Sequence, residues 1–154
     1  MKTLGEWFAL YAESHQNKTN QKIHFICVPA IYFSLVGLFM SISPQLISNF
    51  TKFSNPFIEN WASPPLILVL LFYLRLSFST FVRMLTFSIL CLIGNYFLST
   101  IFSLFYSSLI IFVLAWIGQF YGHKIEGKRP SFLNDLQFLL IGPAWVFEKL
   151  AKKQ

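Results

Sequence analysis

The chain has 154 residues, of which 55% are hydrophobic, 19% aromatic and only 12% charged, and its mean hydropathy is +0.59. Soluble domains carry about 25% charged residues, so this chain has too little charge to cover a water-exposed globule, and we expect lipid to cover it. The net charge is +6, but the basic residues flank apolar runs instead of forming a stripe, which argues against nucleic acid as a partner. The length predicts a single membrane-embedded domain over residues 1–154.

The N-terminal segment carries apolar side chains at helical spacing over positions 4–14. This pattern predicts a short amphipathic helix that lies on the membrane surface. The same segment holds Glu6, Glu13 and His15 and lacks a central apolar run, so we do not expect a cleavable signal peptide.

Four membrane-spanning helices are expected downstream, because about 20 apolar residues are needed to cross the hydrocarbon core. The first covers residues 23–43, the third residues 84–105, and the fourth residues 107–120. The second, over residues 65–81, is interrupted by Arg75, whose side chain must extend towards the headgroups.

The C-terminal apolar stretch, residues 136–148, is too short to cross a bilayer and contains Gly142-Pro143 as a break. We expect a buried, interfacial or re-entrant helix there. The predicted fold is therefore an all-α polytopic membrane helix bundle. A fifth crossing by this stretch is the alternative, and it would move the terminal lysines to the opposite side.

Four crossings place both termini on one side of the membrane, together with every Lys and Arg except Lys52. The positive-inside rule makes that side cytoplasmic. The lipid bilayer is thus an expected partner, and the sequence leaves open whether the membrane is a bacterial inner membrane or that of the endoplasmic reticulum.

This topology brings His15, His24 and His123 to the same membrane face, although they are far apart in the sequence. His15 and His24 are nine residues apart, so on one straight helix of 3.6 residues per turn they would point in opposite directions. A break must separate them if they are to meet. Residues 17–20 supply one, with Asn20 as the expected N-cap of the first span.

Gln119, His123 and Glu126 follow one another at i, i+4 and i+7 and share a face if the fourth helix continues. Polar groups beside lipid need a partner, either each other or an ion. Neutral imidazoles are common metal ligands, and histidines with a carboxylate suit non-haem Fe(II). The pattern therefore predicts a metal centre with three histidine ligands and Glu126, or else Glu148, as a candidate fourth ligand. The alternative is that each histidine only anchors a helix end.

Residues 11–29 read YAESHQNKTNQKIHFICVP, and residues 119–130 read QFYGHKIEGKRP. These two segments resemble the opening motif and the second motif of the membrane-embedded 2-hydroxy fatty acid dioxygenases. The similarity extends to Ile141-Gly-Pro143 and Glu148 and so covers nearly the whole chain. The family usually has glycine where Cys27 stands and alanine where Ser131 stands, and neither departure touches a histidine.

The resemblance implies an Fe(II)-dependent α-oxidation, in which a 2-hydroxy fatty acid reacts with dioxygen and is shortened by one carbon. It makes the three histidines the iron ligands. The candidate substrate-binding residues are Lys22, Arg129, Asn20 and Gln119, and the two cations among them are equally well explained as topology signals. A zinc-dependent lipid hydrolase and a non-catalytic scaffold or lipid-binding protein remain open as alternatives.

Overall fold

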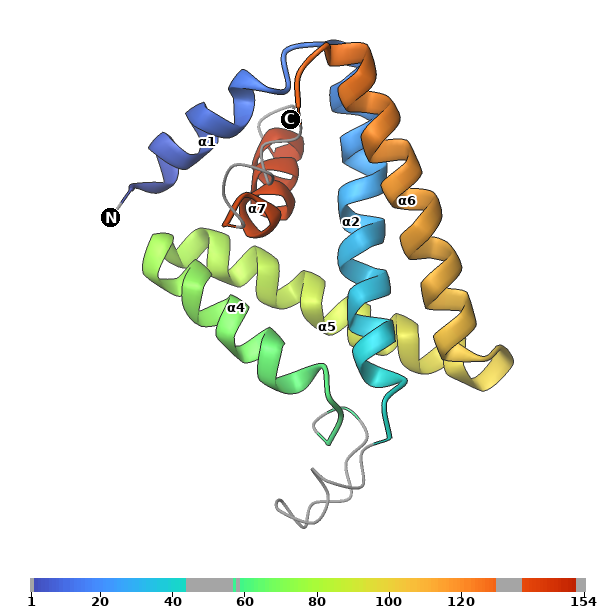
Figure 1. Ribbon diagram of the computed structural model, residues 1–154. Helices are drawn as coiled ribbons and strands as arrows, with labels where there is room; N and C mark the ends of the chain where they lie inside the picture. Colours follow the sequence, from blue (N-terminus) through green and yellow to red (C-terminus); the bar gives the residue numbers. More distant parts are fainter. Residues whose placement is uncertain (1, 44–56, 58, 130–136, 152–154) are drawn as a thin grey trace.

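The computed structural model describes residues 2–43, 57, 59–129 and 137–151, and within these ranges all regular structure is helical (Figure 1). The prediction of an all-α bundle is confirmed. The helices are α1 (Leu4–Glu13), α2 (Lys18–Met40), α4 (Ser63–Leu76), α5 (Phe78–Ile101), α6 (Leu104–Glu126) and α7 (Gln137–Ala151).

Three of these helices, α2, α5 and α6, are long and apolar enough to cross a membrane, as expected of a membrane protein. The second expected span, residues 65–81, is not a single helix. The chain leaves helical geometry at Ser77, where φ is −169° and ψ is 132°. The 14 residues of α4 rise only about 21 Å, less than the roughly 30 Å of the hydrocarbon core. The following helix accordingly begins at Phe78, not at Met84.

The first span also starts earlier than expected. Asn17, not Asn20, is the N-cap of α2, and its side-chain oxygen accepts hydrogen bonds from the backbone N–H groups of Thr19 and Asn20. Because a satisfied N-cap fixes where a helix begins, the break between His15 and His24 falls at residues 14–17. His24 consequently lies nearly two turns inside α2.

The helix α7 lies where a short C-terminal apolar helix was expected, but Gly142-Pro143 does not break it. The helix is continuous through Pro143, and residues 141–146 are all buried. Burial against α1, α2 and α5 supplies the stabilisation that offsets the backbone hydrogen bond lost at a proline inside a helix. Of the predicted charge partition, Lys52, Lys152 and Lys153 lie outside the described residues.

Two glycines of α6 allow α2 and α6 to pack side by side as antiparallel neighbours (Figure 1). A Cβ atom on Gly118 would lie 2.6 Å from Cys27 Sγ, and one on Gly122 would lie 2.4 Å from Asn20 Oδ1. Small residues four positions apart are a common means of bringing membrane helices into close contact. The start of α2 and the end of α6 therefore meet at one end of the bundle.

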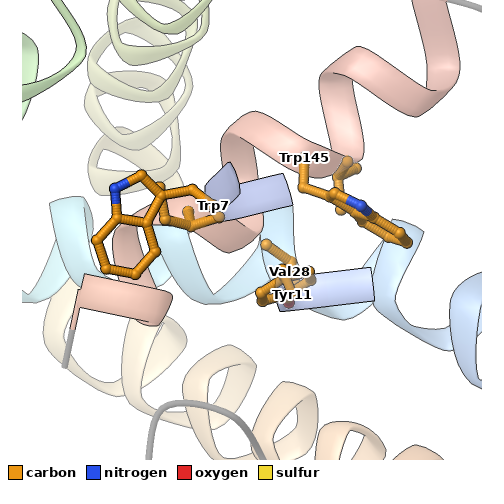
Figure 2. Packing of buried hydrophobic residues seen from close by; sticks show 6 residues of the cluster. Trp7, Tyr11, Val28 and Trp145 are labelled. Atoms are coloured by element: carbon orange, nitrogen blue, oxygen red, sulfur yellow. The ribbon is translucent and has the colours of Figure 1, made fainter. Parts of the chain in front are cut away.

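An aromatic and aliphatic core joins α1, α2 and α7 at that end of the bundle. Figure 2 shows it: Trp7 and Tyr11 of α1 pack with Val28 of α2 and Trp145 of α7. All four side chains are at most 6% exposed. Aromatic residues of this size bury large apolar areas, so the core fixes α1 and α7 over the end of α2 that carries His24.

Candidate metal centre

The three histidines converge in the structure, as the sequence predicted. His15 lies between α1 and α2, His24 on α2 and His123 on α6, and they are 1%, 1% and 5% exposed. One ring nitrogen from each can be chosen so that all three lie within 4.8 Å of one another. The ring centroids are 4.3 to 5.0 Å apart. Imidazoles from three separate chain segments thus share one small buried volume.

The tautomer of His15 follows from its neighbours. Its Nδ1 lies 2.6 Å from the backbone carbonyl oxygen of Tyr11. Because a carbonyl oxygen can only accept, Nδ1 carries the proton and Nε2 presents a lone pair. Burial lowers the pKa of His15 to about 4, so the ring is neutral near pH 7. Neutral imidazole is the form that binds a metal ion.

The donor set fits a metal ion. His15 Nε2 and His24 Nδ1 are 3.2 Å apart. Two nitrogens bound to one ion at about 2.1 Å lie about 3.0 Å apart at a right angle and about 3.4 Å apart at a tetrahedral angle. In addition, His123 Nδ1 is buried without a hydrogen-bond partner among the described residues. A buried polar atom left in this way is costly, and an ion would satisfy it.

Glu126 is not part of the histidine cluster. Its carboxylate accepts hydrogen bonds from the backbone N–H groups of Gln16 at 2.8 Å and Asn17 at 2.9 Å, and from Asn20 Nδ2 at 3.0 Å. These three bonds tie the end of α6 to the turn that carries His15. Carboxylates that orient a metal-binding residue in this manner affect metal affinity without touching the ion.

Other polar residues of the same turn also hold its backbone. Gln21 Nε2 donates to the carbonyl oxygen of His15 at 2.7 Å. Lys128 Nζ, one residue beyond the α6 C-cap Gly127, donates to the carbonyl oxygen of Glu13 at 2.7 Å. The turn is therefore fixed from both sides, by α2 and by the end of α6, which limits the positions that the His15 ring can adopt.

The remaining predicted residues occupy different surroundings. Gln119 is buried and lines the cavity one turn before His123, whereas Asn20 is buried against Gly122 and bonds to Glu126. Lys22 and Arg129 are exposed, and neither lines the cavity. Glu148 forms an ion pair with Arg83 that links α7 to α5.

Two residues of the site, Tyr11 and Gly142, are not among those that the sequence predicts for it. Tyr11 stacks on His15 with ring centroids 4.1 Å apart, and its hydroxyl oxygen lies 3.4 Å from His24 Nδ1. Gly142 permits this arrangement, since a Cβ atom there would lie 3.0 Å from the Tyr11 hydroxyl. Tyr11 is marked only as the first residue of the 11–29 motif, whereas the spacing of Gly118 and Gly122 is a known sequence signal for close helix packing and predicts where His123 approaches α2.

A cavity of about 490 Å³ opens onto the histidines. Its volume lies within the range of small-molecule binding sites, about 300 to 1,000 Å³. The polar side chains of Tyr11, Gln119 and the histidines line one part of it, and apolar side chains of α2, α4, α6 and α7 line most of the remainder. The site can therefore accommodate a molecule with one polar end and one apolar end.

The fold and the site together define a helical membrane protein with a buried three-histidine cluster suited to a metal ion. Residues 1–154 match the family described as 2-hydroxy-palmitic acid dioxygenase Mpo1-like, and the chain belongs to this family. The family indicated by the two sequence motifs is thereby confirmed. No match was found among curated proteins or among solved structures.

Proposed function

We propose that the protein is an Fe(II)-dependent dioxygenase that shortens 2-hydroxy fatty acids by one carbon. The observation that carries the proposal is the cluster of three buried imidazoles at the head of an apolar cavity. Three protein ligands leave coordination positions open for a substrate and for dioxygen. The family description, which names a 2-hydroxy-palmitic acid dioxygenase, supports both the substrate class and the reaction.

The overall chemistry balances without an external reductant. One 2-hydroxy acid and one O₂ give an acid one carbon shorter, one CO₂ and one H₂O. The bond between C1 and C2 breaks, and C2 is oxidised to the new carboxyl carbon. Bound iron would supply dioxygen activation and a Lewis-acid anchor for the substrate carboxylate and hydroxyl.

The side chains around the cluster would bind and orient the substrate. Burial raises the pKa of Tyr11, so its hydroxyl stays protonated and can donate a hydrogen bond. Gln119, on the cavity wall beside His123, can donate from its amide to a carboxylate. Lys22 and Arg129 are exposed and would attract the anionic headgroup towards the site rather than hold it there. Asn20 would act through Glu126.

We place this centre at the cytoplasmic face, with both termini on that side. The α4 and α5 helices return the chain to the end of the bundle at which α6 begins (Figure 1). Lys18 and Lys22 in the first turns of α2 and Lys124 and Lys128 at the end of α6 lie at the histidine end. Positive residues are retained on the cytoplasmic side. The membrane would be a bacterial inner membrane or that of the endoplasmic reticulum.

The proposal is tested with protein purified without chelators and loaded anaerobically with Fe(II) or with Zn(II). Incubation with 2-hydroxypalmitate and oxygen should give the acid one carbon shorter, detected by mass spectrometry, with Fe(II) only. His24→Ala and His123→Ala should abolish this product. Phe97→Ala, which replaces an exposed phenylalanine of α5 outside the cavity, serves as the matched control and should retain activity.

Two results would reverse the assignment. Turnover of lipids with zinc and without oxygen would identify a hydrolase. Unchanged metal content and unchanged lipid turnover in both histidine variants would identify a scaffold or a lipid-binding protein, in which the histidines only stabilise helix ends.

A further inference from the structure

The cavity follows one face of α2 away from the histidines. Its lining residues include His24, Val28, Ile31, Leu35 and Phe39, which recur at intervals of three and four positions, as one face of a helix requires. Because α2 is long enough to cross the membrane, the cavity runs along a spanning helix rather than across the bundle. A ligand with its polar end at the histidines would extend its apolar end along α2.

The side of the cavity formed by α2 and α4 loses its polar groups along this path. Tyr32 also lines the cavity, but its hydroxyl forms a hydrogen bond with Ser88 Oγ of α5 at 2.8 Å. Beyond Tyr32 the lining side chains of α2 and α4 are all apolar. A second polar group on the tail of a ligand would find no partner among these side chains and would be costly to bury.

A packed apolar cluster closes the far part of the cavity. Val36, Ala62 and Leu66 line it and are 4%, 1% and 8% exposed. They belong to one buried cluster with Cys91 of α5. Interiors of this kind are close-packed and leave no room for a longer ligand. Phe39 stands beside this wall at 40% exposure and forms its outer rim.

We infer that the wall of Val36, Ala62 and Leu66, with Phe39 at its rim, sets the longest acyl tail that the site accepts. The inference rests on the proposed function, because it assumes that the carboxylate end of the ligand lies at the histidines. From His24, α2 rises about 18 Å to Val36 in the wall and about 22 Å to Phe39 at the rim. An extended hydrocarbon chain advances about 1.25 Å per carbon, given C–C bonds of about 1.52 Å, so about 14 carbons reach the wall and about 17 reach the rim.

The length limit has a measurable signature. Each methylene transferred from water into an apolar site strengthens binding about fourfold. Affinity should therefore rise steadily with chain length until the tail reaches the wall. Methylenes beyond the wall must leave the cavity beside Phe39 and contribute little further, so the plot of affinity against chain length breaks at about 14 to 17 carbons.

The test measures binding by displacement of a fluorescent fatty acid from the purified protein. Saturated 2-hydroxy acids of about 10 to 22 carbons serve as competitors, and affinities are corrected for partitioning into detergent. Ala62→Phe fills the end of the cavity and should move the break to shorter chains by several carbons. An 18-carbon acid should then bind at least about 10-fold more weakly, while a 10-carbon acid binds as before.

A second variant enlarges the cavity instead, so it places no larger side chain in the packed core. Phe39→Ala removes a half-exposed ring at the rim and should move the break to longer chains. Phe97→Ala removes an equally large exposed ring outside the cavity and should leave the break in place. Thermal unfolding of each variant confirms that it is folded.

The outcomes separate this inference from the proposed function. A break that moves as expected, in a protein that does not shorten 2-hydroxy acids, supports the length limit and overturns only the reaction. Turnover of 2-hydroxy acids with no break, or with a break that neither Ala62→Phe nor Phe39→Ala moves, overturns the length limit and leaves the reaction standing.

Discussion

The carboxylate of Glu126 at the end of α6 accepts a hydrogen bond from the backbone N–H of Gln16, 110 positions earlier in the chain. Gln16 directly follows His15, and Glu126 follows His123 by three residues. The turn that carries His15 and the end of α6 that carries His123 are thus joined by a hydrogen bond that involves no histidine. This link explains how a short turn can hold an imidazole in place beside two membrane helices.

We expect Glu126→Gln to weaken metal binding about 10- to 100-fold, as loss of a group that orients a ligand residue typically does. The amide retains one acceptor oxygen where the carboxylate used two, and its lack of charge weakens the remaining bonds. Metal affinity is measured by competition with a chelator of known affinity. Glu13→Gln, in which an exposed side chain near the same turn changes, is the control. Complete loss of binding with an unchanged fold would instead indicate that Glu126 is a ligand.

Gly122→Ala should destabilise the protein by about 1 to 3 kcal/mol, the usual cost of overpacking a close contact. The added Cβ would lie 2.4 Å from Asn20 Oδ1, and Asn20 is fixed by its bond to Glu126. Gly5→Ala, for which the added Cβ meets nothing within 4 Å, should instead gain up to about 1 kcal/mol because alanine favours a helix. Denaturant unfolding in detergent measures both. Equal effects would contradict the close approach of α2 and α6.

Removal of the metal should lower the melting temperature of the wild-type protein. A ligand that binds only the folded state at 100 times its Kd adds about 2.7 kcal/mol of stability. Thermal unfolding is compared with Fe(II) under anaerobic conditions and with a chelator. The difference should disappear in His24→Ala, which removes one of the three imidazoles. A chelator effect that persists in this variant would place the metal elsewhere.

Glu148→Gln should leave the metal content unchanged, because Glu148 pairs with Arg83 instead of joining the histidines. The pair is partly exposed, with side chains 38% and 21% accessible, so a double-mutant cycle with Arg83→Gln should give a coupling energy of at most about 1 kcal/mol. Metal analysis and unfolding in detergent test the two statements separately. A fall in metal content would restore Glu148 as a ligand.

The helices could be predicted from the sequence to different degrees. Long apolar runs identified α2, α5 and α6, since length and composition decide whether a helix can span a bilayer. The sequence does not predict the break at Ser77, because Arg75 and Ser77 interrupt the apolar run without showing whether the helix ends there or continues with Arg75 extended towards the headgroups. Gly142-Pro143 predicts a break, whereas burial of residues 141–146 keeps α7 continuous. Tertiary packing outweighed local propensity there.

The sequence by itself determined that the chain is helical and apolar enough to cross a membrane, that its histidines belong at one end of the bundle, and to which family it is related. Only the tertiary structure decided that Glu126 holds a turn, that Tyr11 stacks on His15, and that the cavity follows α2. The physical reason is that composition and periodicity report on neighbours along one helix. The bonds of Glu126 and the contact of Gly122 with Asn20 join residues about 100 positions apart, and such contacts exist only once the helices have packed.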